Sequence, residues 1–410
     1  MRFEILRDPL WNNIRVDDLT LELVDTEVFQ RLRYVRQLGW TYLVYPGATH
    51  SRFEHALGTY HLSRRTLALL GEADDAISIS EDEQTIVRSA ALLHDVGHYP
   101  FSHALEEIGA LHHEDVARPL ITEGAVAALL SSRVGEDAPA KVFELIRGRS
   151  ASPLQGLISG SLDLDKIEYL KRDAFMCGVP YGEIDVDRLT NSLVIVDDPD
   201  TGARSLGVRE KALSALESLL FAKYQMYRNV YWHHAVRSAT AMYKRLVEDA
   251  VRGGAVDVES LARHTDEGLM HRIESEKPTS LLAALKERRL YKRAAEWPAA
   301  DLDVDKVEWI ATDRRRVAET ENELAKELKL GPGELLVDYP VKTQMLGLDI
   351  PVLRRNGNVE RLTGEGWTGT INLPSLSEDL YRSARWLRVF TARRTKLEPR
   401  RILDVLERTH

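Results

Sequence analysis

The segment LLHDVGHYPFSH, residues 92–103, ends an apolar stripe with groups that can do chemistry. His94 and Asp95 are adjacent at the expected end of a helix, and imidazole and carboxylate groups are both ligands for Zn, Fe or Mn. An aspartate on a buried face is costly without a partner, and a metal ion would supply one. The alternative is a core histidine with satisfied hydrogen bonds. Taken alone, the pair is more typical of that alternative.

Three further segments give the metal interpretation more weight. His55 lies in SRFEHALG, which reads as another helix, and HYPFSHALEE is followed by LHHED. SLDLDKIEYLKRD is predicted to be an amphipathic helix in which Asp165, Tyr169 and Asp173 recur at four-residue spacing. A lone histidine is usually structural and a polar stripe is usually exposed to solvent, so these alternatives stand beside the metal interpretation.

The helix that leads into residues 92–103 is predicted to begin at a capping box, Ser80-x-x-Glu83. Its buried face is predicted to consist of Ile86, Val87, Ala90, Ala91 and Leu93. His94 and Asp95 continue that face, and Gly97 is expected to end the helix. The helix would therefore deliver both side chains to one place.

The fold class predicted is mainly α, with small β-hairpins and an α+β C-terminal lobe. Apolar residues recur at three- and four-residue spacing from Thr26 to about Ser275. The first 24 residues predict one hairpin, and SLVIV and SLGV around DDPDTGAR predict a second. Beyond about residue 330, ELLVDYPV, DIPVLRR and WTGTINL read as strands, followed by a helix, SEDLYRSARWLRVF. We expect a core of residues 1–275, including the N-terminal hairpin, and a lobe of residues 276–410.

Composition excludes several classes of protein. The single Cys177 rules out a disulfide framework within the chain, and no apolar run approaches the roughly 20 residues needed to span a bilayer. The first residues lack the pattern of a signal peptide, so we expect a soluble cytoplasmic protein with no membrane partner. The net charge of −9 disfavours bulk nucleic-acid binding. The basic segment Tyr381–Arg408 is interpreted as a solvated helical face, or else as a site for anions or a neighbouring subunit.

The order H…HD…D and the strings FQRLRYVRQLG, YPGATHSRFEHALG, LLHDVGHYPFSH and DLDKIEYLKRD resemble the HD-domain deoxynucleoside triphosphate (dNTP) triphosphohydrolases. That family includes bacterial dGTPases and the human SAM-and-HD-domain dNTPase. The resemblance covers roughly residues 5–240 and is specific in order and spacing. It implies an HD helical core and a metal-dependent hydrolase, with no SAM domain expected in this chain.

The resemblance implies a set of metal ligands: His55, His94, Asp95 and Asp165. Such a donor set suits one Mn, Fe or Zn ion with an open position for water. A metal of this kind lowers the pKa of bound water from about 15.7 towards about 7. In the family, the nucleophile attacks the α-phosphorus and releases a deoxynucleoside and intact triphosphate, and Mg can accompany the nucleotide phosphates.

The resemblance also implies catalytic and phosphate-binding residues. His113 matches the proton donor to the leaving 5′-oxygen and Glu106 matches its acidic partner, although the doublet His112–His113 leaves two alignments open. The residues implied to contact phosphate are Arg52, His98, His103, Lys166, Tyr169 and Lys223. Lys223 stands where the human enzyme has arginine, which would replace a bidentate grip with a point charge.

For the sugar, Gln37 and Asp173 match residues that hold the 3′-hydroxyl, and Tyr231 with Leu38 matches the wall that excludes a ribose 2′-hydroxyl. The alternatives are a core aromatic for Tyr231, which lies in an expected long helix, and a surface position for Gln37.

The resemblance further implies a nucleotide effector site and a homo-oligomer. Asp25, Gln30 and Arg33 match a guanine-binding trio, but Glu4 replaces the lysine that holds the activator's phosphates, and a carboxylate repels triphosphate. A structural role for Gln30 and Arg33 is the alternative. Family members assemble as dimers, tetramers or hexamers, with the C-terminal lobe contributing to the interfaces. Two other functions stay open: hydrolysis of another phosphoester (a cyclic nucleotide, an alarmone or a single-stranded DNA end), and a non-catalytic nucleotide sensor.

Overall fold

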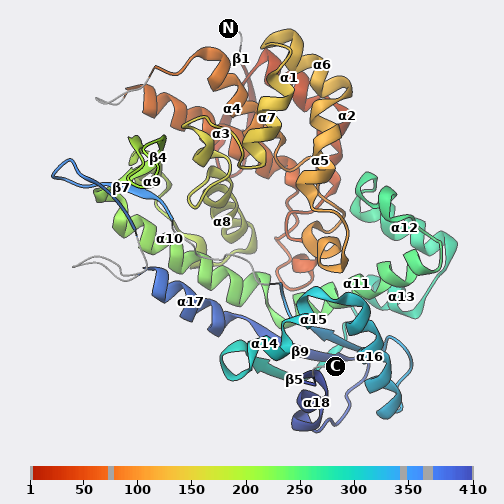
Figure 1. Cartoon of the computed structure of the whole chain (residues 1–410). Coiled ribbons are helices and arrows are strands. Elements are labelled where there is room, and N and C mark those ends of the chain that lie inside the picture. Colours follow the sequence, from red (N-terminus) through yellow and green to blue (C-terminus); the bar gives the residue numbers. More distant parts are fainter. Residues whose placement is uncertain (1–2, 73–77, 342–348, 363–372, 409–410) are drawn as a thin grey trace.

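The computed structural model describes residues 3–72, 78–341, 349–362 and 373–408. Over these residues the chain is mainly helical, with three small sheets placed around the helices (Figure 1). The fold class predicted from the sequence is therefore confirmed. In the described part of the chain, no helix combines the length and apolar character needed to cross a bilayer.

The N-terminal hairpin is present and is followed directly by a helix. Strands β1 (Phe3–Asp8) and β2 (Asn12–Asp17) pair antiparallel. The alternating residues that follow form helix α1 (Asp18–Val24) instead of more strand. Asp17 decides this, because its carboxylate accepts the N–H of Thr20 at 2.8 Å and so caps the helix.

Helices α3 (Arg52–Glu72), α4 (Glu81–Leu93), α7 (Ala138–Ile146) and α8 (Leu164–Cys177) form the centre of the core. Helix α3 packs on α4 and α8, and α4 packs on α7. The five residues predicted to form the inner face of α4 are all buried. These contacts bring the end of α4 and the start of α8 to the same side of α3.

Helix α4 begins as predicted and ends earlier. The Ser80 hydroxyl accepts the N–H of Glu83 at 3.2 Å, but the Glu83 carboxylate accepts from Ser152 and does not complete the box. The prediction that Gly97 ends the helix is wrong, since the last helical residue is Leu93. Gly97 serves close packing: a Cβ there would lie 2.0 Å from the carbonyl oxygen of His113.

The remaining helices of residues 3–290 are α2 (Glu27–Gln30), α5 (His113–Thr122), α6 (Gly124–Arg133), α9 (Val186–Thr190), α10 (Leu213–Met226), α11 (His234–Arg252), α12 (Asp266–Glu276) and α13 (Ser280–Lys286). The long helix expected around Tyr231 is divided: a π-helical turn, Tyr227–Tyr231, separates α10 from α11. The imidazole of His233 accepts the N–H of Ala235 and starts α11. Such π turns occur often at functional sites.

The C-terminal lobe contains a sheet in which β9 (Trp386–Thr391) lies between β5 (Lys292–Pro298) and β6 (Leu335–Asp338). The helix predicted to reach Phe390 is wrong beyond Ala384, where α17 (Leu373–Ala384) ends. Residues 386–391 are strand because β5 and β6 supply antiparallel partners on both sides. The other helices of the lobe are α14 (Val304–Val307), α15 (Trp309–Thr312), α16 (Arg314–Glu327) and α18 (Pro399–Leu406).

The predicted second hairpin, β3 (Leu193–Asp197) and β4 (Arg204–Arg209), is confirmed. Strand β7 (Pro351–Leu353) pairs parallel to β4 and antiparallel to β8 (Val359–Arg361). The DIPVLRR segment thus contains a strand, while residues 367–372 of the predicted strand WTGTINL lie outside the described residues.

The basic segment near the C-terminus is only partly a solvated face. Arg385 and Arg388 are buried, and the guanidinium of Arg385 binds both carboxylate oxygens of Glu308 at 2.8 and 2.9 Å. That guanidinium also lies 3.6 Å from the ring centre of Tyr339. Arg385 is therefore a structural residue of the lobe.

Candidate metal centre and active site

Four side chains from three helical segments lie together, and the ligand atoms of His55, His94 and Asp95 are all within 4.8 Å of one another. His55 extends from α3, His94 caps the end of α4, Asp95 follows it, and Asp165 lies in the first turn of α8. The Nε2 atoms of the two histidines lie 3.2 Å apart, and Asp165 Oδ1 is 2.9 Å from His55 Nε2 and 3.5 Å from His94 Nε2. The carboxylate of Asp95 lies 3.6 and 3.4 Å from the same two nitrogens.

These separations fit a shared cation. Two donor atoms that each lie about 2.1 Å from an ion, at right angles to one another, are about 3 Å apart. The donor set of two imidazoles and two carboxylates suits a divalent transition metal. The side chains of His55, His94 and Asp95 are almost fully buried, whereas that of Asp165 is 33% exposed, so the cluster has an open side.

Hydrogen bonds fix both imidazoles with Nε2 directed into the cluster. His55 Nδ1 lies 2.6 Å from the carboxylate of Glu168, and His94 Nδ1 lies 2.9 Å from the carbonyl oxygen of Ala91. Both partners only accept, so in the neutral ring each Nδ1 carries the proton and each Nε2 offers its lone pair. The residues present therefore fit a metal ion.

The electrostatics of the cluster favour positive charge. Burial opposes a charge on His55, but hydrogen bonds to Asp165 and Glu168 outweigh it and raise the pKa of His55 to about 10. Burial likewise opposes charge on Asp95, yet Arg52 and His94 hold the pKa of that carboxyl well below its usual range. The same carboxylates that favour a proton here would favour a cation.

Glu168 belongs to a buried polar network behind His55. Besides His55, its carboxylate accepts from Arg172 Nε at 2.7 Å and from Trp11 Nε1 at 2.9 Å. Arg172 also binds Asp8, at the end of β1. Gly58 leaves room for this arrangement, because a Cβ there would lie 2.0 Å from Glu168 Oε1. The N-terminal hairpin thus helps to hold the imidazole ring of His55 in place through Glu168.

A second cluster, of three histidines and a glutamate, lies beside the first. His113 Nδ1 is 2.7 Å from Glu106 Oε1, and His103 Nδ1 is 3.3 Å from Glu106 Oε2. The rings of His98 and His113 stack 3.8 Å apart, and His98 Nε2 lies 3.1 Å from Asp95 Oδ1. The hydrogen bond to Asp95 connects the two clusters.

The charges within this second cluster are set by burial and by Glu106. Burial raises the pKa of the Glu106 carboxyl, but hydrogen bonds to His103 and His113 outweigh it and hold that pKa well below its usual range. Burial lowers the pKa of His113 below its usual value, although Glu106 opposes this. Burial and Arg52 lower the pKa of His98 strongly. In the free protein at neutral pH, a carboxylate therefore orients a mostly neutral His113.

The structure distinguishes His112 from His113. His113 is the histidine that pairs with Glu106. His112 is half exposed, lies 3.6 Å from Glu114, and borders a cavity next to the two clusters. The geometry favours His113 for any chemistry that depends on Glu106.

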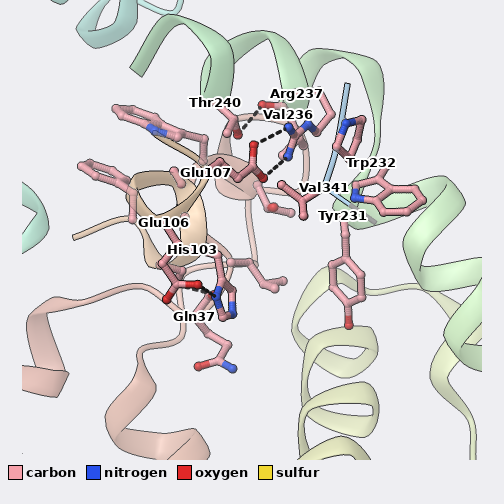
Figure 2. A pocket seen from close by; sticks show the side chains of 18 of the residues that line it. Gln37, His103, Glu106, Glu107, Tyr231, Trp232, Val236, Arg237, Thr240 and Val341 are labelled. Carbon is pink, nitrogen blue, oxygen red and sulfur yellow. Dashed lines mark hydrogen bonds and ion pairs between the residues drawn. The ribbon is translucent and has the colours of Figure 1, made fainter. Parts of the chain in front are cut away.

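A cavity of about 640 Å³ adjoins the clusters. Among its lining residues, Gln37, His103, Glu106 and Tyr231 are seen in Figure 2. Leu38, Arg52, Tyr169 and Asp173 line it as well. The Oε1 atom of Gln37 is buried and has no hydrogen-bond partner in the described structure, so a ligand hydroxyl would satisfy it.

Asp173 is held between two partners at the cavity wall. Its carboxylate accepts from the Tyr231 hydroxyl at 2.7 Å and lies 2.8 Å from His50 Nε2. Tyr231 is thus a pocket residue on the π turn and not a core aromatic. The polar stripe of α8 faces the site and not solvent, since Asp173 is buried.

Cationic groups surround the region between the cavity and the clusters. Arg52 binds Asp95 at 2.6 Å and Ser102 at 3.2 Å. Lys166 binds the carbonyl oxygen of Gly160 and the carboxylate of Asp163. Burial, together with the charge of Lys166, lowers the pKa of Lys223 to about 8. A phosphate group would relieve this repulsion between cations.

Two of the three residues matched to an effector site, Gln30 and Arg33, bind each other. Gln30 donates to the carbonyl oxygen of Val24 and accepts from Arg33 Nε at 2.8 Å, and Arg33 lies 3.5 Å above the ring of Phe53. Asp25 ends α1. This trio does not line the active-site cavity.

Several residues of the site were not predicted from the sequence. Glu168, Trp11 and His50 are examples, and their partners lie far away along the chain. A weak signal existed for Glu168, which stands three residues after Asp165 and so shares its side of α8. For Trp11 no local pattern marks the contact.

Comparison with known proteins finds two family matches in this chain. Residues 52–165 match the HD domain family and residues 184–365 match the HD associated region. An uncharacterized protein of Methanocaldococcus jannaschii is 34% identical over 341 residues, which cover 82% of this chain and 69% of that protein. A protein of Dictyostelium discoideum named as a deoxynucleoside triphosphate triphosphohydrolase SAMHD1 homolog is 29% identical over 84% of this chain and 68% of its own. The chain thus spans about two thirds of each relative's length.

A solved structure shares the whole fold. The crystal structure of a hypothetical protein from Aquifex aeolicus superposes with a TM-score of 0.73 at 27% identity and covers 99% of both chains. The helical core and the cluster of His55, His94, Asp95 and Asp165 together define an HD-domain phosphohydrolase. Within that class, the chain belongs to the HD-domain dNTP triphosphohydrolase family.

Proposed function

We propose that the protein is a metal-dependent dNTP triphosphohydrolase that uses Mn, Fe or Zn at the cluster of His55, His94, Asp95 and Asp165. One observation carries the proposal: this cluster lies beside the His113–Glu106 pair, at the edge of a cavity of about 640 Å³. The family's activity supports the choice of substrate.

The proposed reaction breaks one bond of the nucleotide. Water attacks the α-phosphorus, the bond between that phosphorus and O5′ breaks, and O5′ takes up a proton. The products are a deoxynucleoside and triphosphate. A divalent metal, when bound, acts as a Lewis acid that lowers the pKa of water towards about 7.

His113 would supply the proton to O5′ from its Nε2. Its Nδ1–H donates to Glu106, which fixes the ring and stabilises the charged form. The triphosphate adds negative charge near an imidazole whose pKa burial has lowered. Binding of the substrate would therefore raise that pKa and load the acid when it is needed.

Triphosphate would be bound by cationic and polar groups, with Mg as a counterion for its oxygens. We assign this role to Arg52, His98, His103, Lys166, Tyr169 and Lys223. Arg52 and the Lys166–Lys223 pair are the strongest candidates, because all three are largely buried cations. Their positive charge would attract the negatively charged triphosphate and hold the α-phosphorus next to the metal centre.

The sugar would occupy the cavity between Gln37 and Asp173. Gln37 has a free buried acceptor and Asp173 has carboxylate lone pairs for the 3′-hydroxyl. Tyr231 and Leu38 would form the wall that leaves no room for a 2′-hydroxyl.

Product analysis tests the reaction class. Purified protein is incubated with Mn²⁺ and each dNTP in ¹⁸O-water, and products are separated by mass. We expect deoxynucleoside without label and triphosphate that carries one labelled oxygen. Release of orthophosphate or pyrophosphate would refute the reaction, and equal rates on rNTPs would favour a different phosphohydrolase.

We further propose a cytoplasmic homo-oligomer (a dimer, tetramer or hexamer) in which residues 276–410 contribute to the interface. An effector nucleotide at Asp25, Gln30 and Arg33 would have to replace the hydrogen bond between Gln30 and Arg33. Measuring the mass of the assembly with and without nucleotides tests both.

A further inference from the structure

The segment that carries His103 and Glu106 begins with a strained turn. Phe101 and Ser102 adopt φ angles of 56° and 65°, and neither is glycine. L-residues avoid this left-handed region, and two in succession persist only when the surroundings enforce them. The 3₁₀ helix that follows, Ser102–Ile108, carries His103 and Glu106. The position of the turn therefore sets the position of both side chains.

Asp266, the first residue of α12, binds this turn. Its side chain is completely buried, and Oδ1 accepts the backbone N–H of Phe101 at 2.7 Å. Oδ2 accepts the backbone N–H and the Nη1–H of Arg36, both at 3.1 Å. One carboxylate thus connects α12 with the turn and with the residue that precedes Gln37.

The connection continues to the metal centre. Ser102 Oγ lies 2.7 and 2.8 Å from the carbonyl oxygens of Arg36 and Gln37 and accepts from Arg52, which binds Asp95. Arg31 makes a second connection between the residues just before α12 and the site. It donates to the carbonyl oxygen of His264 and to those of Val96 and His98.

Helix α12 does not need Asp266 for its own cap. Thr265 provides the cap, because its hydroxyl accepts the N–H of Gly268 at 3.1 Å. Asp266 is completely buried, and both of its carboxylate oxygens already accept N–H groups of Phe101 and Arg36, so it binds the turn and not the substrate. Burial raises the pKa of Asp266 to about 6, against the N–H groups of Phe101 and Arg36, which lower it. Removal of this buried carboxylate would leave the N–H groups of Phe101 and Arg36 without their partner, which is costly in a buried site.

We propose that Asp266 is a positioning residue that holds the Phe101–Ser102 turn from α12 and thereby places His103, Glu106 and Gln37 for catalysis. This proposal rests on the proposed function, which assigns Glu106 to the acid pair and His103 and Gln37 to substrate binding. We call the hydrogen bonds from Asp266 to this turn and to Arg36 the brace. Asp266 lies beyond residues 52–165, so the brace comes from outside the segment that matches the HD domain family.

Two variants test the proposal, and two others serve as controls. Asp266→Asn keeps one acceptor and loses the other, and Asp266→Ala loses both. Glu267→Gln is the charge control, since the Glu267 side chain is 70% exposed and binds Nη2 of Arg36 at 2.6 Å. Thr265→Ala is the control for helix stability, because it removes the cap and leaves the brace intact.

Two readouts are combined. Residue-resolved hydrogen exchange should show a slow Phe101 amide in the wild type and at least about tenfold faster exchange in both Asp266 variants. Turnover of dGTP, or of bis(4-nitrophenyl) phosphate if no dNTP is hydrolysed, should fall roughly tenfold to hundredfold in kcat. Metal content should be unchanged, and both controls should keep wild-type kcat.

Fast exchange of Phe101 in the wild type would overturn the brace, even if the variants failed to fold. Equal losses of kcat in Thr265→Ala and Asp266→Asn would overturn the positioning role in favour of helix stability. Because exchange needs no substrate, a wild type without activity on dNTPs would refute the proposed function and leave the brace to be decided by exchange.

Discussion

His55 Nε2 lies 2.9 Å from Asp165 Oδ1, although the two residues belong to helices that are far apart in the sequence. Neither helix would place these groups together by itself. Their approach follows from the packing of α3 against α8, with His94 and Asp95 supplied from the end of α4. Since a buried cluster of this kind is costly without a cation, the fold at this point is built around a ligand set.

Loss of Asp165 should remove the metal. Asp165→Ala deletes a carboxylate that contacts both imidazoles, so we expect metal affinity to fall by more than about 100-fold and turnover to disappear. Elemental analysis after dialysis measures the first effect. Asp173→Asn is the control, because Asp173 binds Tyr231 and His50 and should leave metal content intact. Full activity of Asp165→Ala would exclude the metal centre.

Replacement of His113 should abolish turnover without loss of metal. His113→Ala removes the proposed acid, and such groups contribute about 10²–10⁴-fold. His112→Ala should cost much less, since His112 pairs with Glu114 and not with Glu106. Rates and metal content of both variants are measured together. The reverse order of effects would assign the acid to His112.

Glu106 should set the pH range of activity. Its carboxylate raises the pKa of His113 against burial, so Glu106→Gln should lower that pKa further. Activity needs His113 protonated, and the alkaline limb of kcat/KM should therefore move to lower pH. A pH profile from 5 to 9 measures it. Glu114→Gln, which changes the charge beside His112, should leave the limb in place; an unmoved limb in Glu106→Gln would contradict the pairing.

Glu168 should tune metal affinity through His55. Glu168→Ala should weaken binding by about 10–100-fold, because the ring loses the partner that orients it. Gly58→Ala offers an independent route, since its Cβ would displace the Glu168 carboxylate. Gly71→Ala on the same helix has open space and serves as its control. Competition with a chelator gives the affinities, and equal values for Gly58→Ala and Gly71→Ala would argue against this role.

Tyr231 should control selection of the sugar. Tyr231→Ala opens the wall of the cavity, and we expect the preference for dGTP over GTP to fall by about tenfold or more in kcat/KM. Tyr231→Phe loses only the hydrogen bond to Asp173 and should keep most of the preference. An unchanged ratio in Tyr231→Ala would place the discrimination elsewhere.

The sequence predicted the parts of the site that local patterns encode. Apolar periodicity placed His94 and Asp95 at a helix end, and family strings placed His55 and Asp165 on two others. It could not predict Glu168 with Trp11 or Asp266 with Phe101, because such contacts depend on how distant segments pack.

The errors of the fold prediction have the same origin. Residues 386–390 continue a helical pattern locally but become strand because β5 and β6 offer partners. The π turn at Tyr231 interrupts a run that reads as one helix. The division of the chain near residue 275 stays a prediction.

The most direct test of the central claim is a crystal structure of the metal-loaded protein with data collected at the absorption edge of the bound element. We expect one anomalous peak about 2.0–2.3 Å from His55 Nε2, His94 Nε2 and the carboxylates of Asp95 and Asp165. No peak there, or a peak only among His98, His103, Glu106 and His113, would contradict it.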